Sequence, residues 1–337
     1  MKDKIRFAVV GYGYIGKRHA EMINGFSEAE LVAICDNRTK EAIGLTTDLP
    51  FFSSIEDLLN SGIEIDVVTI ATPNGLHAKH ALIALQNNKH IVVEKPMSLT
   101  KADCEKIIYK ALQMHKKVFC VMQNRYSPPS IWLKEIVSEK RLGNIYMVQI
   151  NCFWNRDDRY YKKDSWHGKK DMDGGTLFTQ FSHFIDIMYW LFGDIKNIDS
   201  HLYNFNHSEL SEFEDSGIVT FAFLEGGVGN VNFSTSIWDK NLESSLTIIG
   251  EKGSVKIGGQ YMNKVEQCHI KDYNMPDLPA SNPPNDYGPF KGSAANHQYV
   301  FQNVIDVIHN KSSIDTNALE GMKIVEIIEK IYARKIL

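Results

Sequence analysis

Short runs of β-branched residues alternate with helical patterns from residue 4 to about residue 122. The expected strands are Ile5–Val10, Glu30–Cys35, Val67–Ala71, His90–Val93 and Lys117–Met122. Apolar residues at helical spacing predict helices at Ile15–Phe26, His77–Gln86 and Ala102–Met114. Alternation of this kind is typical of a parallel sheet with crossover helices. Residues 1–122 are therefore expected to form a doubly wound Rossmann domain, the α/β part of the fold.

After Gln123 the strands become longer and follow one another directly. Pro128-Pro129 predicts the start of a helix, and Asn144–Trp154 has the pattern of one long strand. Further strands are expected at Ile195–Tyr203, Gly217–Phe223, Val228–Ile237 and Leu246–Ile249, with turns at Glu225-Gly226-Gly227 and Glu251-Lys252-Gly253. Residues 123–337 are thus expected to form an α+β domain, a largely antiparallel open sheet with helices on one face.

Both faces of the strand Asn144–Trp154 are largely apolar. Tyr146, Val148, Ile150, Cys152 and Trp154 form one face, and Ile145, Met147 and Phe153 lie on the other. Because an antiparallel sheet that is apolar on both faces needs a partner on each, we expect helices on one side and a second copy of the chain on the other. The pattern predicts a homo-oligomer, a dimer or a tetramer.

Composition narrows the class of partner. The formal net charge of -4 at pH 7 gives no overall basic field, so neither nucleic acid nor a membrane surface is an expected partner. No stretch reaches the roughly 20 apolar residues of a membrane span, and residues 1–11 lack the pattern of a signal peptide. The five cysteines are scattered without a C-x-x-C pair, and no metal site is predicted. These features favour a cytoplasmic protein with a small-molecule ligand.

Six residues between the first expected strand and helix form a glycine motif, Gly11-Tyr12-Gly13-Tyr14-Ile15-Gly16. Such a run is typical of a dinucleotide site, because its glycines permit a tight turn, a close approach of the diphosphate and close packing of helix on strand. Asp36 stands 20 residues past Gly16 (36 minus 16), where a carboxylate accepts hydrogen bonds from the ribose hydroxyls of NAD. NAD is therefore the predicted cofactor, with further contacts from Asn37 and Arg38. Arg38 leaves NADP open, since a guanidinium also suits a 2′-phosphate.

Two short motifs follow strands at the carboxyl edge of the predicted sheet, where doubly wound folds bind ligands. Ala71-Thr72-Pro73-Asn74 follows the strand that begins at Val67, and Glu94-Lys95-Pro96 follows the strand His90–Val93. The remaining cofactor contacts are expected at Thr72, Pro73, Asn74, His77, Glu94, Lys95 and Gln123. A cis Lys95-Pro96 bond, which proline permits, would fix the direction of the lysine amine.

Asp173-Gly174-Gly175 precedes an amphipathic helix predicted over Thr176–Phe192. Thr179 and His183 are i, i+4 neighbours on one face of that helix, and Asp186 follows three residues later. A lone helical histidine is ordinarily a core residue. The hydroxyl and the acid beside this one, downstream of a cofactor domain, favour a catalytic role instead.

Cations and tyrosines are concentrated in Gln123-Asn124-Arg125-Tyr126 and in residues 155–163. Such charges are usually solvated, yet arginine forks suit phosphate or carboxylate groups, and we favour anion recognition for part of the set. The expected substrate contacts are Lys95, Arg125, Tyr126, Asn155, Arg156, Arg159, Tyr160, Tyr161, Thr179, Gln180 and His183.

The glycine motif, the 71–74 and 94–96 motifs and the helix with His183 together resemble the Gfo/Idh/MocA oxidoreductases, over essentially the whole chain. In that family the E-K-P lysine and the helical histidine lie beside the nicotinamide and the reacting hydroxyl, which implies Lys95 and His183 as catalytic residues. Thr179 stands where inositol and glucose dehydrogenases usually carry aspartate, and it completes the expected catalytic set. The resemblance leaves open whether His183 or Lys95 takes the hydroxyl proton.

Three groups of residues look more like the branch that oxidises C3 of UDP-N-acetylglucosaminuronate in surface polysaccharide sugar biosynthesis. They are Gln123-Asn124-Arg125-Tyr126, Asn155-Arg156 with Tyr160-Tyr161, and Thr179-Gln180. His167 stands where many relatives have arginine. The resemblance implies an NAD-dependent dehydrogenase that converts a sugar hydroxyl to a ketone. The alternatives are a dehydrogenase of a free polyol or aldose and a non-catalytic NAD(P)-binding sensor; the presence of both Lys95 and His183 argues against the sensor.

Overall fold

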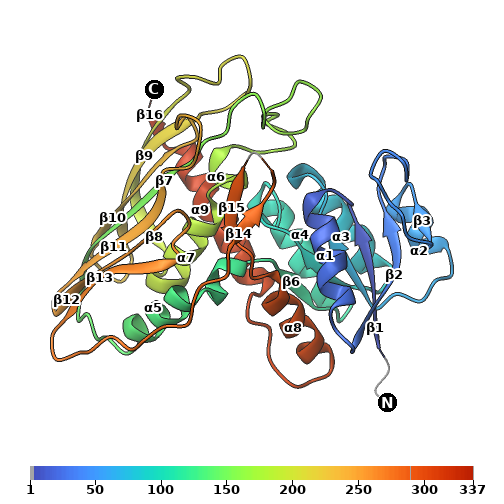
Figure 1. Ribbon diagram of the computed structural model, residues 1–337, viewed down its shortest axis with the longest axis horizontal. Coiled ribbons are helices and arrows are strands. Elements are labelled where there is room, and N and C mark those ends of the chain that lie inside the picture. Colours follow the sequence, from blue (N-terminus) through green and yellow to red (C-terminus); the bar gives the residue numbers. More distant parts are fainter. Residues whose placement is uncertain (1–3, 289, 337) are drawn as a thin grey trace. The chain divides into compact units, whose positions relative to one another are not determined.

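The computed structural model describes residues 4–288 and 290–336, so residues 1–3, 289 and 337 of the two expected domains lie outside the described residues. The chain divides into two compact units, coloured along the sequence in Figure 1. The first unit holds the residues up to Met122 together with His297–Val325. The second holds Gln123–Asn296 together with the residues from Glu326 on.

The return of residues 297–325 to the first unit corrects the expected second domain, which ran without interruption to residue 337. Helix α8, His297–Ile308, explains the difference. Its Phe301 ring is fully buried, 5.0 Å from the ring of His19 and 6.0 Å from that of Phe7. Contacts between residues almost 300 positions apart leave no local pattern in the sequence.

The first unit contains the predicted Rossmann fold. Its sheet has the order β3-β2-β1-β4-β5-β6, and each pairing is parallel. The strands are β1 Ile5–Val10, β2 Ala29–Cys35, β3 Phe51–Phe52, β4 Val67–Ile70, β5 His90–Val93 and β6 Val118–Cys120. The helices besides α8 are α1 Tyr14–Asn24, α2 Ile55–Asn60, the 3-10 helix η1 Asn74–Leu76, α3 His77–Gln86 and α4 Lys101–Gln113. The five expected strands and three expected helices are confirmed, with ends that are identical or differ by one or two residues.

The second unit is built on an open sheet of order β13-β12-β11-β7-β10-β9-β8-β16. Its strands are β7 Ile145–Phe153, β8 Ile195–Tyr203, β9 Ser216–Phe223, β10 Val228–Ser234, β11 Glu243–Gly250, β12 Gly253–Gly258, β13 Lys264–Ile270 and β16 Lys335–Ile336. The pairs β7·β10 and β8·β16 are parallel and the other pairs are antiparallel. The predicted largely antiparallel sheet is confirmed.

Helices cover one face of this sheet, as Figure 1 shows for α7. They are η2 Gln123–Tyr126, α5 Pro128–Ser138, α6 Thr176–Thr179 and α7 Ser182–Phe192, while α9 Ala318–Ala333 begins in the first unit and ends in the second. A hairpin of β14 Pro284–Asp286 and β15 Lys291–Ala294 lies apart from the large sheet. The rings of Trp154 and Phe233 on the sheet side pack 5.4 and 5.8 Å from that of Phe181, which fixes the covered face.

The other face of the sheet is polar at its centre and apolar toward one end. Asn232 donates a hydrogen bond to Asn151 across the β7·β10 pair. Toward the end, Met147 is the cross-strand neighbour of both Val228 and Ile249, and all three side chains are exposed. The exposed apolar side chains of this face thus include this row and also Ile218, the cross-strand neighbour of Asn232. The homo-oligomer stays a prediction.

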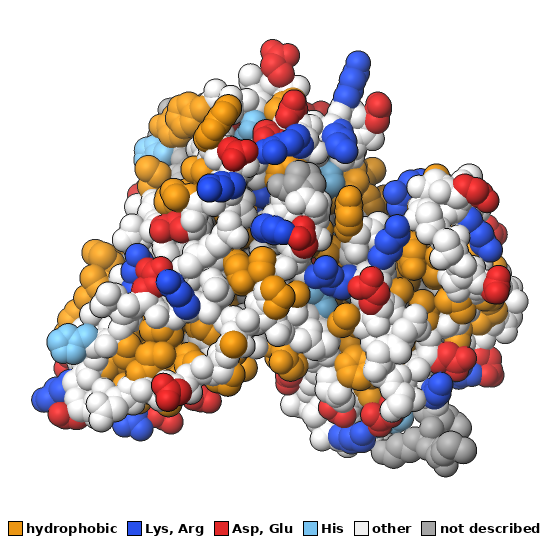
Figure 2. All heavy atoms as spheres, in the orientation of Figure 1, with side chains coloured by type: hydrophobic (Ala, Val, Ile, Leu, Met, Phe, Trp, Pro, Cys, Tyr) orange, Lys and Arg blue, Asp and Glu red, His pale blue; other side chains and the backbone are white. Residues whose placement is uncertain are grey.

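None of the described helices is long and apolar enough to cross a membrane. On the face shown in Figure 2, Lys and Arg side chains are interspersed with Asp and Glu and form no continuous basic area.

Candidate active site

The turn between β1 and α1 leaves backbone open at the start of a helix. Gly11 has φ +89°, and a Cβ on it would lie 2.6 Å from the Ala71 carbonyl oxygen. A Cβ on Gly16 would collide with the Gly11 carbonyl, which explains how closely helix and strand pack. Gly13, by contrast, has nothing within 4 Å of its Cβ position and is the N-cap of α1. The N–H groups of a helix start exposed in this way suit a diphosphate.

Asp36 is buried at the end of β2 with hydrogen bonds to both oxygens. Its Oδ2 accepts from the backbone N–H of Tyr12 at 2.7 Å, and its Oδ1 accepts from the backbone and side chain of Arg38. Burial raises the pKa of Asp36, but the hydrogen bonds from Arg38 and Tyr12 outweigh it and hold the pKa below its usual value. The carboxylate is thus ionised and able to accept from hydroxyls, whereas the half-exposed Arg38 is already bound to it.

The motif after β5 places Lys95 at the carboxyl edge of the sheet. The Lys95-Pro96 bond is cis and the Lys95 side chain is partly exposed. His77 and Glu94, two of the expected cofactor contacts, are buried and have partners inside the protein. The ring of His77, 1% exposed, lies with Nδ1 2.7 Å from the Pro96 carbonyl and Nε2 2.8 Å from the Thr72 carbonyl. Burial lowers the pKa of His77, and a neutral imidazole has one N–H, so the ring donates to one of these carbonyls and lies against the other.

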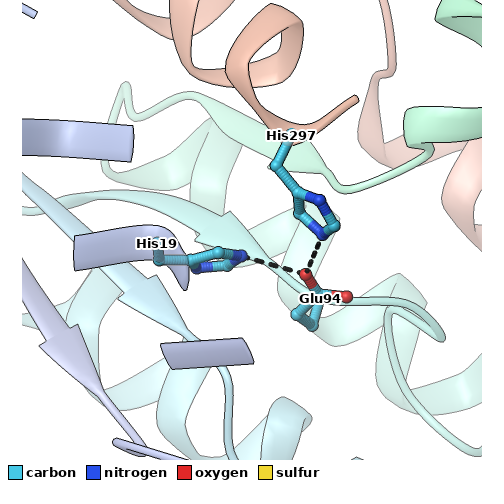
Figure 3. A group of neighbouring side chains, drawn as sticks. All are labelled: His19, Glu94 and His297. Atoms are coloured by element: carbon cyan, nitrogen blue, oxygen red, sulfur yellow. Dashed lines mark hydrogen bonds and ion pairs between the residues drawn. The ribbon is translucent and has the colours of Figure 1, made fainter. Parts of the chain in front are cut away.

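Glu94 lies in a buried group that the sequence did not reveal. Figure 3 shows His19 and His297 directed at its Oε1, with their Nε2 atoms at 2.9 and 3.5 Å. The other oxygen of Glu94 accepts the backbone N–H of Lys95 at 3.2 Å. The one local signal for His19 is its position three residues after Gly16 on the buried face of α1. His297 has none, because it reaches Glu94 through the late return of the chain.

In the second unit, the helix expected over Thr176–Phe192 is two helices, α6 and α7, with Phe181 between them. The spacing of apolar residues continues through the break, so periodicity alone predicts one helix. The break has a packing reason, because it turns the fully buried Phe181 ring onto Trp154 and Phe233. Thr179 and His183 are consequently not neighbours within one helix. The Thr179 hydroxyl donates to the backbone carbonyl and carboxylate of Asp173.

His183 lies in the first turn of α7 and is buried. The amide nitrogen of Gln123 is 3.2 Å from its Nε2. Because an amide NH₂ group donates, this contact suits the tautomer in which Nε2 accepts, the form that a proton acceptor requires.

Asp186, the acid expected to support His183, is paired with Arg125 instead. The two side chains are 0% and 4% exposed, and the Arg125 Nε lies 3.0 Å from Oδ2 of the carboxylate. The guanidinium also packs over the ring of Trp190. This internal ion pair corrects the expectation of Arg125 as a substrate contact, since its charge is used to fasten η2 to α7.

Arg156 differs from the other arginines of the set. It is 2% exposed, and no carboxylate of the described residues lies within ion-pair distance of it. Its Nε donates to Gln180 at 2.8 Å, and its remaining bonds go to the carbonyls of Asn155 and Lys291 and to Asn241. Burial lowers the pKa of Arg156, and nearby tyrosines oppose the shift. The site therefore contains a buried cation held by neutral groups alone.

The other expected substrate contacts take different places. Arg159 is exposed and pairs with Asp157. Tyr161 packs in the core against His207 and Phe213, which corrects its expected role at a sugar hydroxyl. The structure brings together Arg156, Gln180 and Tyr160, whose hydroxyl accepts from the Gln180 amide at 2.7 Å. Tyr126 is partly exposed in η2, and Asn155 donates to the Ile237 carbonyl beside a small pocket that Lys240 and Lys291 help to line.

Comparison with known protein families and structures gives consistent matches over both units. Residues 5–122 match the model of the Gfo/Idh/MocA oxidoreductase family, NAD-binding Rossmann fold, and residues 131–256 match a Gfo/Idh/MocA C-terminal domain. The WlbA dehydrogenase of Bordetella pertussis, solved with NADH and UDP-GlcNAcA, is similar with a TM-score of 0.88 and 31% identity, covering 98% of this chain and 96% of that one.

Two further relatives show the range of likeness. The WlbA dehydrogenase of Chromobacterium violaceum, solved with the same two ligands, is similar with a TM-score of 0.87 and 30% identity, covering 99% of this chain and 94% of that one. The inositol 2-dehydrogenase of Salmonella typhimurium is 28% identical over 262 residues, 75% of this chain and 74% of that protein.

Proposed function

Because this chain is an NAD-dependent sugar oxidoreductase belonging to the Gfo/Idh/MocA family, we propose that it oxidises the C3 hydroxyl of UDP-N-acetylglucosaminuronate to a ketone. The product would be a 3-keto nucleotide sugar for surface polysaccharide synthesis. The observation that carries the proposal is the buried guanidinium of Arg156, which has no carboxylate partner among the described residues.

A buried charge is costly unless an opposite charge or several hydrogen bonds compensate it. Arg156 has hydrogen bonds to neutral groups and the faces of aromatic rings, with Trp154 and Phe290 at 4.8 and 5.2 Å. An arriving carboxylate or diphosphate would supply the missing negative charge and accept a charge-assisted hydrogen bond from the guanidinium. A free polyol supplies no such charge, so this feature favours a sugar acid linked to a nucleotide.

The residues of the first unit fit NAD. Gly13 leaves open space at the start of α1 for the diphosphate, and the ionised Asp36 offers acceptors for ribose hydroxyls. NAD, when bound, accepts the hydride that leaves the sugar carbon. Asn37, Thr72 and Asn74 are retained as proposed contacts of the cofactor.

The proposed chemistry divides between Lys95 and His183. The Gln123 contact suits the tautomer in which Nε2 of His183 accepts, and the sugar hydroxyl would take the place of the Gln123 amide and give its proton to this nitrogen. The ammonium of Lys95 would stabilise the developing alkoxide. Thr179 takes no proton in this proposal, because its hydroxyl donates a hydrogen bond to Asp173.

The test is NADH formation with UDP-N-acetylglucosaminuronate, its uncharged parent UDP-N-acetylglucosamine and myo-inositol, measured side by side. We expect turnover of the acid and a loss of kcat/KM of roughly 30-fold or more in Arg156→Gln, from the 2 to 5 kcal/mol expected when one partner of a buried charged pair is removed. Arg159→Gln is the matched control, because Arg159 is exposed and paired with Asp157. Efficient turnover of inositol with none of the acid would refute the proposal and favour a polyol dehydrogenase.

A further inference from the structure

Three buried side chains from distant parts of the sequence meet beside the Lys95 backbone (Figure 3). His19 comes from α1, Glu94 from the end of β5 and His297 from the start of α8. Their exposed fractions are 0%, 6% and 1%. A group of this kind, inside the first unit and next to a proposed catalytic residue, calls for a physical account.

The hydrogen bonds define the protonation of the group. Burial raises the pKa of Glu94, but the two imidazoles outweigh it and hold the pKa well below its usual value, so Glu94 is an anion. Its Oε1 is hydrogen-bonded to Nε2 of His19 at 2.9 Å, whereas Nε2 of His297 approaches the same oxygen to 3.5 Å without hydrogen-bond geometry. Its Oε2 accepts the backbone N–H of Lys95. Donors on both oxygens offset the cost of burying the carboxylate.

Two histidines and a glutamate are also a ligand set for zinc, but the geometry favours direct hydrogen bonding. The 2.9 Å from His19 Nε2 to Glu94 Oε1 is an ordinary hydrogen-bond distance. Metal-bound imidazoles generally donate their second N–H to a carboxylate or carbonyl. The Nδ1 atoms of His19 and His297 have no such partner among the described residues.

The backbone of Lys95 is held from the opposite side as well. His77 is directed at the carbonyl of Pro96, the next residue, at 2.7 Å. The backbone N–H of Lys95 and the backbone carbonyl of Pro96, on the two sides of the Lys95 side chain, are thus both contacted by buried side chains.

We propose that Glu94, held by His19 and His297, is a positioning residue that fixes the direction from which Lys95 presents its ammonium group. It acts through Lys95 and touches neither substrate nor cofactor. The activity readout rests on the proposed function, whereas the spectroscopic readout below does not. A misdirected catalytic group typically lowers the rate by one to two orders of magnitude, while cofactor affinity depends mainly on other contacts.

The first experiment compares Glu94→Gln and His297→Gln with His309→Gln, a control just past the far end of α8. We expect the first two to lower kcat roughly 10- to 100-fold with little change in the Kd of NADH, and the control to leave both near native. His297→Gln keeps the test available if Glu94→Gln does not fold. Native kcat in both network variants, or an equal loss in the control, would overturn the proposal.

A double-mutant cycle then asks whether the effect passes through Lys95. In a Lys95→Ala background, Glu94→Gln should have little further effect, because the group that it positions is gone. If Glu94→Gln lowers kcat by the same factor in the Lys95→Ala background as in the wild type, Glu94 acts elsewhere and the inference is contradicted.

A third measurement is independent of turnover. The NMR resonance of the ¹³Cε-labelled Lys95, assigned from its absence in Lys95→Arg, should shift in Glu94→Gln and His297→Gln but not in His309→Gln. If the wild type oxidises no nucleotide sugar, the proposed function fails while this comparison still decides the positioning role. Unshifted resonances would overturn it. So would a stoichiometric metal in the purified wild type that His297→Gln no longer holds.

Discussion

Replacing Asp186 by asparagine leaves the guanidinium of Arg125 buried without its anion. The pair is 4% and 0% exposed, and the carboxylate accepts hydrogen bonds from both Nε and Nη2 of Arg125. Breaking one partner of such a pair costs about 3–5 kcal/mol. Asparagine keeps one oxygen that still accepts from the guanidinium, so we expect the lower end, about 3 kcal/mol.

A loss of that size is a large part of the 5–15 kcal/mol that stabilises a typical domain. It corresponds to a melting temperature roughly 6–12 °C lower, at about 2–4 °C per kcal/mol for domains of 150–250 residues. Tryptophan fluorescence is a suitable probe because all five tryptophans, Trp132, Trp154, Trp166, Trp190 and Trp238, belong to the second unit.

The control replaces both partners, as Arg125→Met with Asp186→Leu, which removes the unpaired charge and the pair together. A hydrophobic pair of similar volume is often neutral or stabilising, so we expect this double variant to unfold near the wild-type temperature. If Asp186→Asn melts like the wild type but loses its turnover, the acid orients His183 after all, and the assignment of a structural ion pair is wrong.

Three further predictions concern the cofactor, the chemistry and assembly. NAD should have a higher kcat/KM than NADP, because the Asp36 carboxylate repels a 2′-phosphate, and a preference for NADP in the wild type would contradict this. Lys95→Ala and His183→Ala should each lower kcat by a factor of roughly 10² or more. The Kd of NADH, measured by fluorescence titration, should stay almost unchanged. Thr179→Val should lower kcat less. Near-native turnover in either alanine variant would remove that residue from the mechanism. Met147→Lys should shift the molar mass from light scattering toward the single chain, if the exposed row on the sheet joins two copies; an unchanged mass would place the interface elsewhere.

The parallel sheet was predictable because its strands are buried on both faces and appear as continuous apolar runs. In β4, each of the four residues Val67–Ile70 is buried, including Thr69. Within residues 4–122, the strand Phe51–Phe52 and the helix Ile55–Asn60 escaped prediction because they are too short to show a period. Local pattern is sufficient where the element is long and its environment uniform.

The candidate site divides along the same line. Lys95 and the dinucleotide-binding glycines belong to short motifs of consecutive residues, so the sequence alone predicts their roles. The sequence does not show which cation of the second unit is paired with an internal acid, because Arg125 meets Asp186 61 residues further along the chain. Arg156 is also an arginine in a segment rich in polar residues, so the sequence does not distinguish it from Arg125. Only the fold shows that Arg125 is paired with a carboxylate.

The late return of residues 297–325 has a consequence for how the chain reaches its native state during synthesis. When residue 122 has left the ribosome, the first unit still lacks α8, and Phe7 and His19 lack the side chain of Phe301 that packs on them. The end of β6 also waits for the Thr316 carbonyl, which accepts the N–H of Cys120. The cofactor-binding unit therefore completes only after residues 123–296 of the second unit have been translated. A fragment cut at residue 122 omits an integral part of the Rossmann unit, whereas a chain that joins residue 122 to residue 297 through a short linker would contain it.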